Sequence, residues 1–123
     1  GGHAFGFMDP KDLKSRDTRF ADFLEHRSEV LSWIKEFSPY EHVSSDDPPV
    51  YLSYSSAPAL GQEQKDPTHT SNYGVKLQEK CASAGIACEL SYPGADSVKH
   101  TTVHAYLIDT LTAQKQAPTS SRP

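Results

Sequence analysis

The sequence has no long hydrophobic run, no basic cluster and only two cysteines. No apolar stretch approaches the roughly 20 residues that a membrane-spanning helix needs, and no signal peptide is apparent. The chain has 12 basic and 16 acidic residues, which gives a net charge of −4. We therefore expect a soluble protein that binds neither a membrane nor nucleic acid. These features do not assign a cellular compartment.

Motifs that identify several enzyme classes are also absent. The sequence contains no G-x-S-x-G, the signature of a nucleophilic serine on a strand-to-helix turn, and no Gly-rich phosphate loop. It has no H-E-x-x-H and no metal-type cysteine pair, so we expect neither a metal nor a cofactor. His100 and His104 are four residues apart and could hold a metal on one helix face, with Asp96 as third ligand. We regard this as the weaker alternative.

At 123 residues the chain is one domain or part of one. Residues 1–45 are expected to form a short strand near 4–8 and a helical segment near 18–37. The aromatic residues of that segment are expected to pack on the sheet or, alternatively, to cap a pocket. Residues 46–113 are predicted to form a strand–helix–strand–helix unit. Residues 114–123 have no apolar period and are predicted to be a disordered tail.

The unit in residues 46–113 carries the clearest local pattern. Pro48 and Pro49 favour an extended backbone before the β-forming residues 50–54. The following helix has apolar residues spaced four, four and three apart on one face: Tyr73, Leu77, Cys81 and Ala84. Gly85 suits the end of that helix, and residues 88–92 form the second strand. Strands joined by a helical crossover are parallel, so we predict an α/β fold with a small parallel sheet of two or three strands flanked by helices.

The last predicted helix begins after the second strand, with Thr101 or Thr102 as its N-cap. Its apolar side is formed by Val103, Leu107, Ile108 and Leu111. The two cysteines, Cys81 and Cys88, fall near the end of the first helix and the start of the second strand. Their side chains can therefore approach each other. Two half-buried free thiols are the favoured interpretation and a disulfide is the alternative.

A set of segments in this part of the chain resembles a known family. In order, DDPPVYLSYS, DPTHTSNYGVKLQEKCASAGIACELSYPGA and AYLIDTL resemble the C-terminal part of α/β-hydrolase-fold esterases and lipases. The resemblance covers residues 38–112. It implies the penultimate strand, the crossover helix, the last strand and the final helix of that fold. Because a complete hydrolase sheet has many more strands, the resemblance implies a C-terminal fragment of a carboxylesterase-like hydrolase.

The resemblance also implies candidate catalytic residues. A serine hydrolase needs a nucleophilic serine, a histidine base and an orienting carboxylate, and in this fold they occur in the order serine, acid, histidine. The acid position falls on Asp66, in the long loop 56–70, and the histidine position on His100, with His104 as runner-up. The plainer interpretations are an ordinary Asp-Pro turn and two polar residues at a helix start. Without a nucleophile, the chain alone is expected to be inactive.

A small parallel sheet leaves apolar faces and strand edges uncovered. We therefore expect either self-association, as a dimer or larger assembly, or association with the missing N-terminal part of the fold. The alternative function is a stand-alone oligomeric binding or assembly module derived from a hydrolase fold.

Overall fold

The computed structural model describes residues 22–23, 25–66, 68–96 and 98–116. The regular elements follow each other as η2 (Arg27–Val30), α3 (Leu31–Phe37), β1 (Val50–Ser53), α4 (Asn72–Ala84), β2 (Cys88–Ser91) and α5 (Val103–Gln116). The strand predicted near 4–8 and the end of the tail, 117–123, lie outside the described residues. α5 continues to Gln116, past the boundary at 113 that the sequence indicates.

The two strands are parallel neighbours, as the crossover pattern predicts. The register runs from Val50 opposite Cys88 to Ser53 opposite Ser91. The pairing is extended at its start, where the Val50 N–H donates to the Ala87 carbonyl at 2.9 Å. Across the described residues the sheet has these two strands, so the chain has a small α/β fold.

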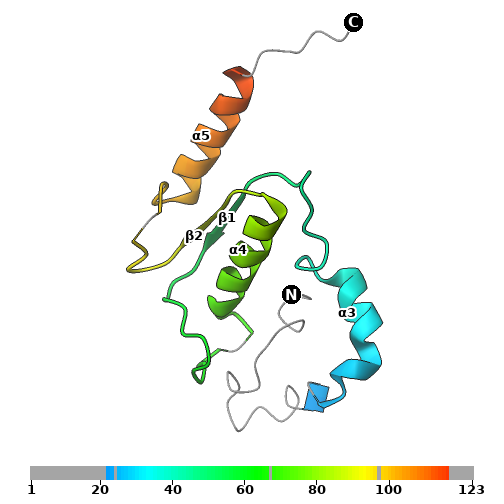
Figure 1. Cartoon of the computed structure of the whole chain (residues 1–123). Helices are drawn as coiled ribbons and strands as arrows, with labels where there is room; N and C mark the ends of the chain where they lie inside the picture. The colour runs from blue at the N-terminus through cyan, green and yellow to red at the C-terminus, as the bar shows by residue number, and fades with distance from the viewer. Residues whose placement is uncertain (1–21, 24, 67, 97, 117–123) are drawn as a thin grey trace, which may run out of the picture.

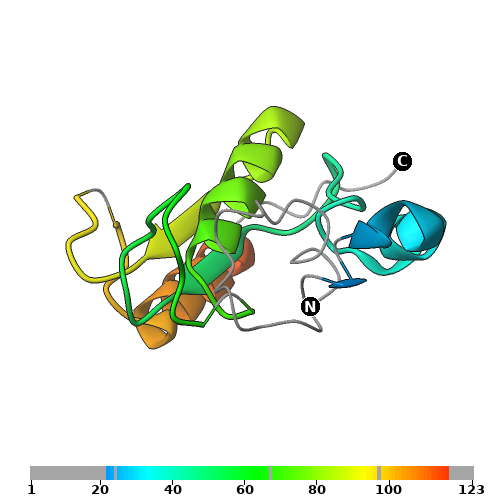
Figure 2. The same cartoon turned by 90° about the horizontal axis from the view of Figure 1, so that it is seen from below.

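α4 and α5 cover opposite faces of the sheet, and Figure 2 shows the strands between them. Successive side chains of a strand point to opposite faces. Leu90 of β2 therefore faces α4, where it approaches Gly74. Tyr51 of β1 faces the other way and stacks on Tyr106 of α5, with 5.0 Å between ring centroids. This second face carries the polar residues discussed below.

α4 ends where the sequence predicts. Gly85 adopts the left-handed conformation, φ 78°, which glycine accepts without the steric penalty of a Cβ atom. Its N–H donates to the Ala82 carbonyl at 3.1 Å, and the Ile86 N–H donates to the Cys81 carbonyl at 2.8 Å. On the predicted apolar face, Tyr73 and Cys81 are buried. The glycine turn therefore fixes the distance between α4 and the start of β2.

The helical segment before the sheet breaks near His26, as the sequence indicates, and continues as the short helix η2 and then α3. α3 ends at Phe37, two residues before Pro39. The expectation that its aromatic residues pack on the sheet is wrong for Trp33 and Phe37, which are 54% and 57% exposed. They contact each other instead, and Figure 1 shows α3 to one side of the sheet. α3 instead buries Ile34, which is 1% exposed.

α5 begins with a side-chain cap. Thr102 Oγ1 accepts the Ala105 N–H at 3.1 Å, which selects Thr102 from the two predicted caps. Tyr106 is the buried aromatic residue of this helix. The predicted apolar side is between 48% and 59% exposed at all four positions, Val103, Leu107, Ile108 and Leu111. The helix therefore packs on the sheet through Tyr106 and leaves its aliphatic stripe uncovered in the described structure.

Candidate functional site

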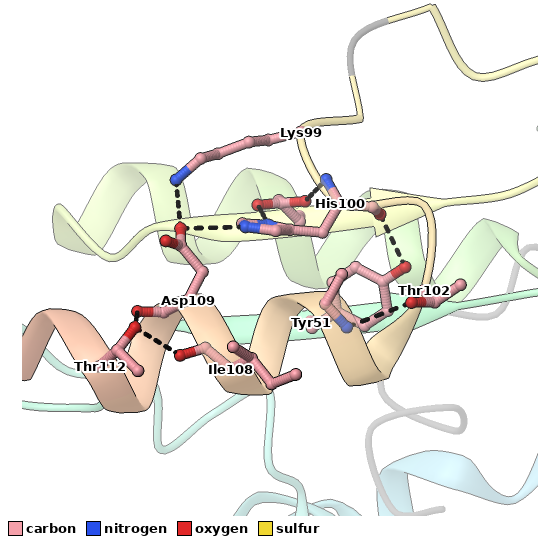
Figure 3. A network of polar contacts seen from close by, with 9 residues as sticks. Tyr51, Lys99, His100, Thr102, Ile108, Asp109 and Thr112 are labelled. Carbon is pink, nitrogen blue, oxygen red and sulfur yellow. Dashed lines mark hydrogen bonds and ion pairs between the residues drawn. The ribbon is translucent and has the colours of Figure 1, made fainter.

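His100 lies between β2 and α5 and is the buried histidine of the described residues, 9% exposed. Its Nδ1 atom is 2.6 Å from Glu89 Oε1, and its backbone N–H donates to Glu89 Oε2 at 3.0 Å. On the other side of the ring, Nε2 is 3.1 Å from Asp109 Oδ2 (Figure 3). The imidazole is thus held between one carboxylate from β2 and one from α5.

The two contacts of the His100 ring bear on which of its nitrogens carry a hydrogen. A neutral imidazole has one donor and one acceptor nitrogen, whereas an imidazolium donates from both. Both His100 nitrogens face carboxylate oxygens, so the imidazolium satisfies both contacts and the neutral ring satisfies one. In this arrangement Nε2 faces the Asp109 carboxylate, whereas a general base must face the proton that it takes from a hydroxyl group.

Lys99 adds a second cation beside Asp109. Lys99 Nζ is 2.6 Å from Asp109 Oδ2 (Figure 3). Hydrogen bonds from Lys99 and then from His100 lower the pKa of Asp109, and the hydrogen bond to Asp109 raises the pKa of Lys99. Both side chains are more than half exposed, so water screens their attraction and the Lys99 pair contributes little to stability.

Aromatic residues fix the backbone around His100. The Tyr51 hydroxyl donates to the His100 carbonyl at 3.0 Å. The Tyr106 ring meets the His100 ring edge-on, with 5.5 Å between centroids and an interplanar angle of 82°. Tyr51 stands directly opposite Glu89 in the sheet register. One face of the sheet therefore supplies both the carboxylate and the phenol that position this histidine.

Asp66 occupies a separate, local arrangement in the loop between β1 and α4. Its carboxylate accepts hydrogen bonds from the Thr68 hydroxyl at 2.9 Å and lies 3.0 Å from His69 Nδ1. These two partners lower the pKa of Asp66. Among the hydrogen bonds and ion pairs of the described residues, none joins Asp66 to His100. The family resemblance implies that the two act together. In this structure each contacts other partners instead.

His104, the runner-up, is exposed on the first turn of α5. Because α5 begins at Val103, His100 precedes the helix, and the two histidines do not share a helix face. Within the described ranges, no group of three or more histidine, cysteine or acidic side chains is arranged to hold a metal ion.

The sequence analysis missed Glu89 and Asp109, the two carboxylates that hold His100. Glu89 carried a usable signal, since it is the charged residue in the four-residue strand Cys88–Ser91. A charged group in a strand covered by helices needs a partner, because burying an unpaired charge is costly. Asp109 carried no such signal, because acidic residues are common on a helix with a solvent-exposed side.

A cavity lies on the opposite side of the sheet from His100. It is an apolar cavity of about 320 Å³ between α4 and the segment that leads into β1. Its lining includes Val43, Pro48 and Val50 before and in β1, and Leu77 and Cys81 of α4. The volume lies at the lower end of the range for small-molecule sites. His100 is not part of its lining.

No described helix combines the length and apolar character needed to cross a membrane. Comparisons with protein-family models, with curated proteins and with solved structures find no match for this chain.

Proposed function

We propose that this chain is the C-terminal part of a carboxylesterase-like α/β-hydrolase and that it is inactive alone. The observation that carries the proposal is a buried histidine in the connection between the second of two parallel strands and the last described helix, with a carboxylate 2.6 Å from Nδ1. In a serine hydrolase, a carboxylate on Nδ1 orients the imidazole for proton transfer at Nε2. Glu89 meets this geometric requirement, whereas Asp66 holds the acid position that the family resemblance implies.

In the complete enzyme, the contact between His100 Nε2 and Asp109 must open. A base must offer a free Nε2 to the serine hydroxyl, and here Nε2 contacts Asp109. Asp109 is half exposed and also pairs with Lys99. The contact with His100 can therefore break while the Asp109 carboxylate keeps a charged partner and its contact with water. The remaining part of the fold would supply the serine and the backbone N–H groups that stabilise the oxyanion.

The first test measures ester hydrolysis. The chain alone is expected to leave p-nitrophenyl acetate hydrolysis at the buffer rate and to resist labelling by a fluorophosphonate probe. Sequencing the locus is expected to find G-x-S-x-G upstream in frame, and the extended protein is expected to hydrolyse the ester. His100→Ala should lower its kcat by about 100- to 10,000-fold, whereas His104→Ala should retain activity.

Two results would contradict this proposal. One is an upstream reading frame without a nucleophile motif. The other is hydrolysis by the chain alone that disappears in His100→Ala.

A second candidate function, a self-associating module, is supported by the uncovered stripe of α5. Its four aliphatic side chains lie on one side of the helix and are about half exposed. Sheets rarely leave their strand edges unprotected. In the described structure, each strand pairs along one edge only.

Light scattering tests this second candidate. At micromolar concentrations the chain is expected to be a dimer or larger. Leu107→Glu with Leu111→Glu should weaken the dimer by at least about tenfold, because each leucine loses apolar burial. Ala105→Glu adds a charge at another exposed position of α5 and should leave the dimer intact. A monomer throughout the concentration range would exclude this function.

A further inference from the structure

The two cysteines lie next to each other across the contact between α4 and β2. Cys81 is on the buried face of α4 and is 1% exposed, whereas Cys88 begins β2 and is half-buried. Both are free thiols, and Cys81 lines the same cavity as Val50, the residue opposite Cys88 in the sheet register. Because α4 packs on β2 at this point, we expect a small movement to bring the two sulfur atoms to bonding distance.

Backbone contacts hold this pair in place. The Ile86 N–H donates to the Cys81 carbonyl at 2.8 Å, just before the chain enters β2. The Gln78 side chain donates to the Cys88 carbonyl at 2.9 Å, which ties the same two elements together one turn earlier. Cys88 is also fixed by its register opposite Val50 in β1. The approach of the two thiols is therefore set by the fold and not by loose side chains.

We propose that Cys81 and Cys88 form a reversible disulfide that locks the C-terminal end of α4 to the start of β2. The oxidant is a low-molecular-weight disulfide, represented by oxidised glutathione. The Cys88 thiolate attacks one glutathione sulfur, which forms a mixed disulfide and releases one glutathione thiolate. Cys81, after losing its proton, then attacks the Cys88 sulfur and releases the second. The cysteine pair loses two electrons and two protons, and the oxidant leaves as two glutathione thiols.

The surroundings of the two thiols determine which one reacts first and make this first attack slow. Cys88 is the more exposed sulfur and lines a surface cavity of about 270 Å³, so the oxidant reaches it first. Burial, and then the neighbouring Cys81, raise the pKa of Cys88 to about 12. Because the thiolate is the attacking species, exchange at neutral pH is slow and accelerates as the pH rises.

Equilibration in glutathione redox buffers, read by mass spectrometry, tests the proposal. The native chain is expected to lose two hydrogens and both titratable thiols while its band remains monomeric on a non-reducing gel. The oxidised form should melt about 5 to 15 °C higher, because the cross-link restricts the unfolded chain. The equilibrium constant for disulfide formation should be at least tenfold larger for the native chain than in 8 M urea.

The comparison with urea keeps the test independent of any variant, because both arms use the same chain. Cys88→Ser serves as a matched control that retains Cys81 and should form no internal cross-link. Two retained thiols, a stable glutathione adduct, or an equilibrium constant no larger than in urea would each overturn the proposal.

Discussion

Glu89→Ala is expected to lower the free energy of unfolding by about 2–4 kcal/mol. Glu89 Oε2 accepts a hydrogen bond from the His100 backbone N–H, and Glu89 Oε1 lies 2.6 Å from His100 Nδ1. The side chains of the pair are 10% and 23% exposed, so most of their hydration is lost on folding. Removing the carboxylate leaves the backbone N–H and the Nδ1 atom of His100 without their partner in that setting. We place the loss below the effect expected for a fully buried pair because Glu89 retains some contact with water.

Urea denaturation of three variants separates the charge from the general packing of the site. Glu89→Gln keeps the shape and a carbonyl acceptor and should lose less than Glu89→Ala. The double variant Glu89→Ala with His100→Ala should recover part of the loss, because it leaves no buried ring nitrogen without its carboxylate partner. Asp109→Ala removes the exposed carboxylate and should have little effect. Equal losses for the Glu89 and Asp109 variants would show that Glu89 does not anchor His100.

The β1–α4–β2 unit was predictable because the residues that determine it constrain the backbone at or next to their own positions. Pro48 and Pro49 restrict the backbone immediately before β1. Gly85 is the residue that accepts φ 78° at the end of α4. Short-range constraints of this kind act in the isolated chain and do not depend on what packs against it. The parallel pairing then follows from the crossover connection, and the observed register agrees with it.

The partners of His100 were not predictable, because they depend on tertiary placement. Glu89 precedes His100 by 11 positions and Asp109 follows it by 9, and the two carboxylates lie on a strand and a helix. Whether both carboxylates reach His100 depends on the rotation of α5 about its own axis on the sheet. Tyr106 sets that rotation by stacking on Tyr51, which turns Asp109 toward the histidine. Chain order favours Asp66 as the partner, but the Thr68 and His69 side chains engage that carboxylate within one turn.

Gly74→Ala is expected to destabilise the fold by about 1–3 kcal/mol, although alanine is the better helix former. A Cβ atom at this position would lie 2.5 Å from Tyr54 Cε2 and 2.6 Å from Leu90 Cδ1. Both distances are too short for contact between carbon atoms, so α4 or the two side chains must move. Leu90 is 7% exposed and has little free space into which to shift. The gain in helix propensity, about 1 kcal/mol, is therefore smaller than the cost of separating α4 from the sheet.

Thermal and urea unfolding test this contact directly. Ser83→Ala, on the exposed side of the same helix, should change the free energy of unfolding by no more than about 0.5 kcal/mol. Gly74→Val should cost more than Gly74→Ala, since a larger side chain enters the same contact. A double variant, Gly74→Ala with Leu90→Ala, should relieve part of the clash and show coupling between the two sites. A Gly74→Ala chain more stable than the parent would mean that α4 does not approach β2 this closely, and the placement of Cys81 beside Cys88 would lose its support with it.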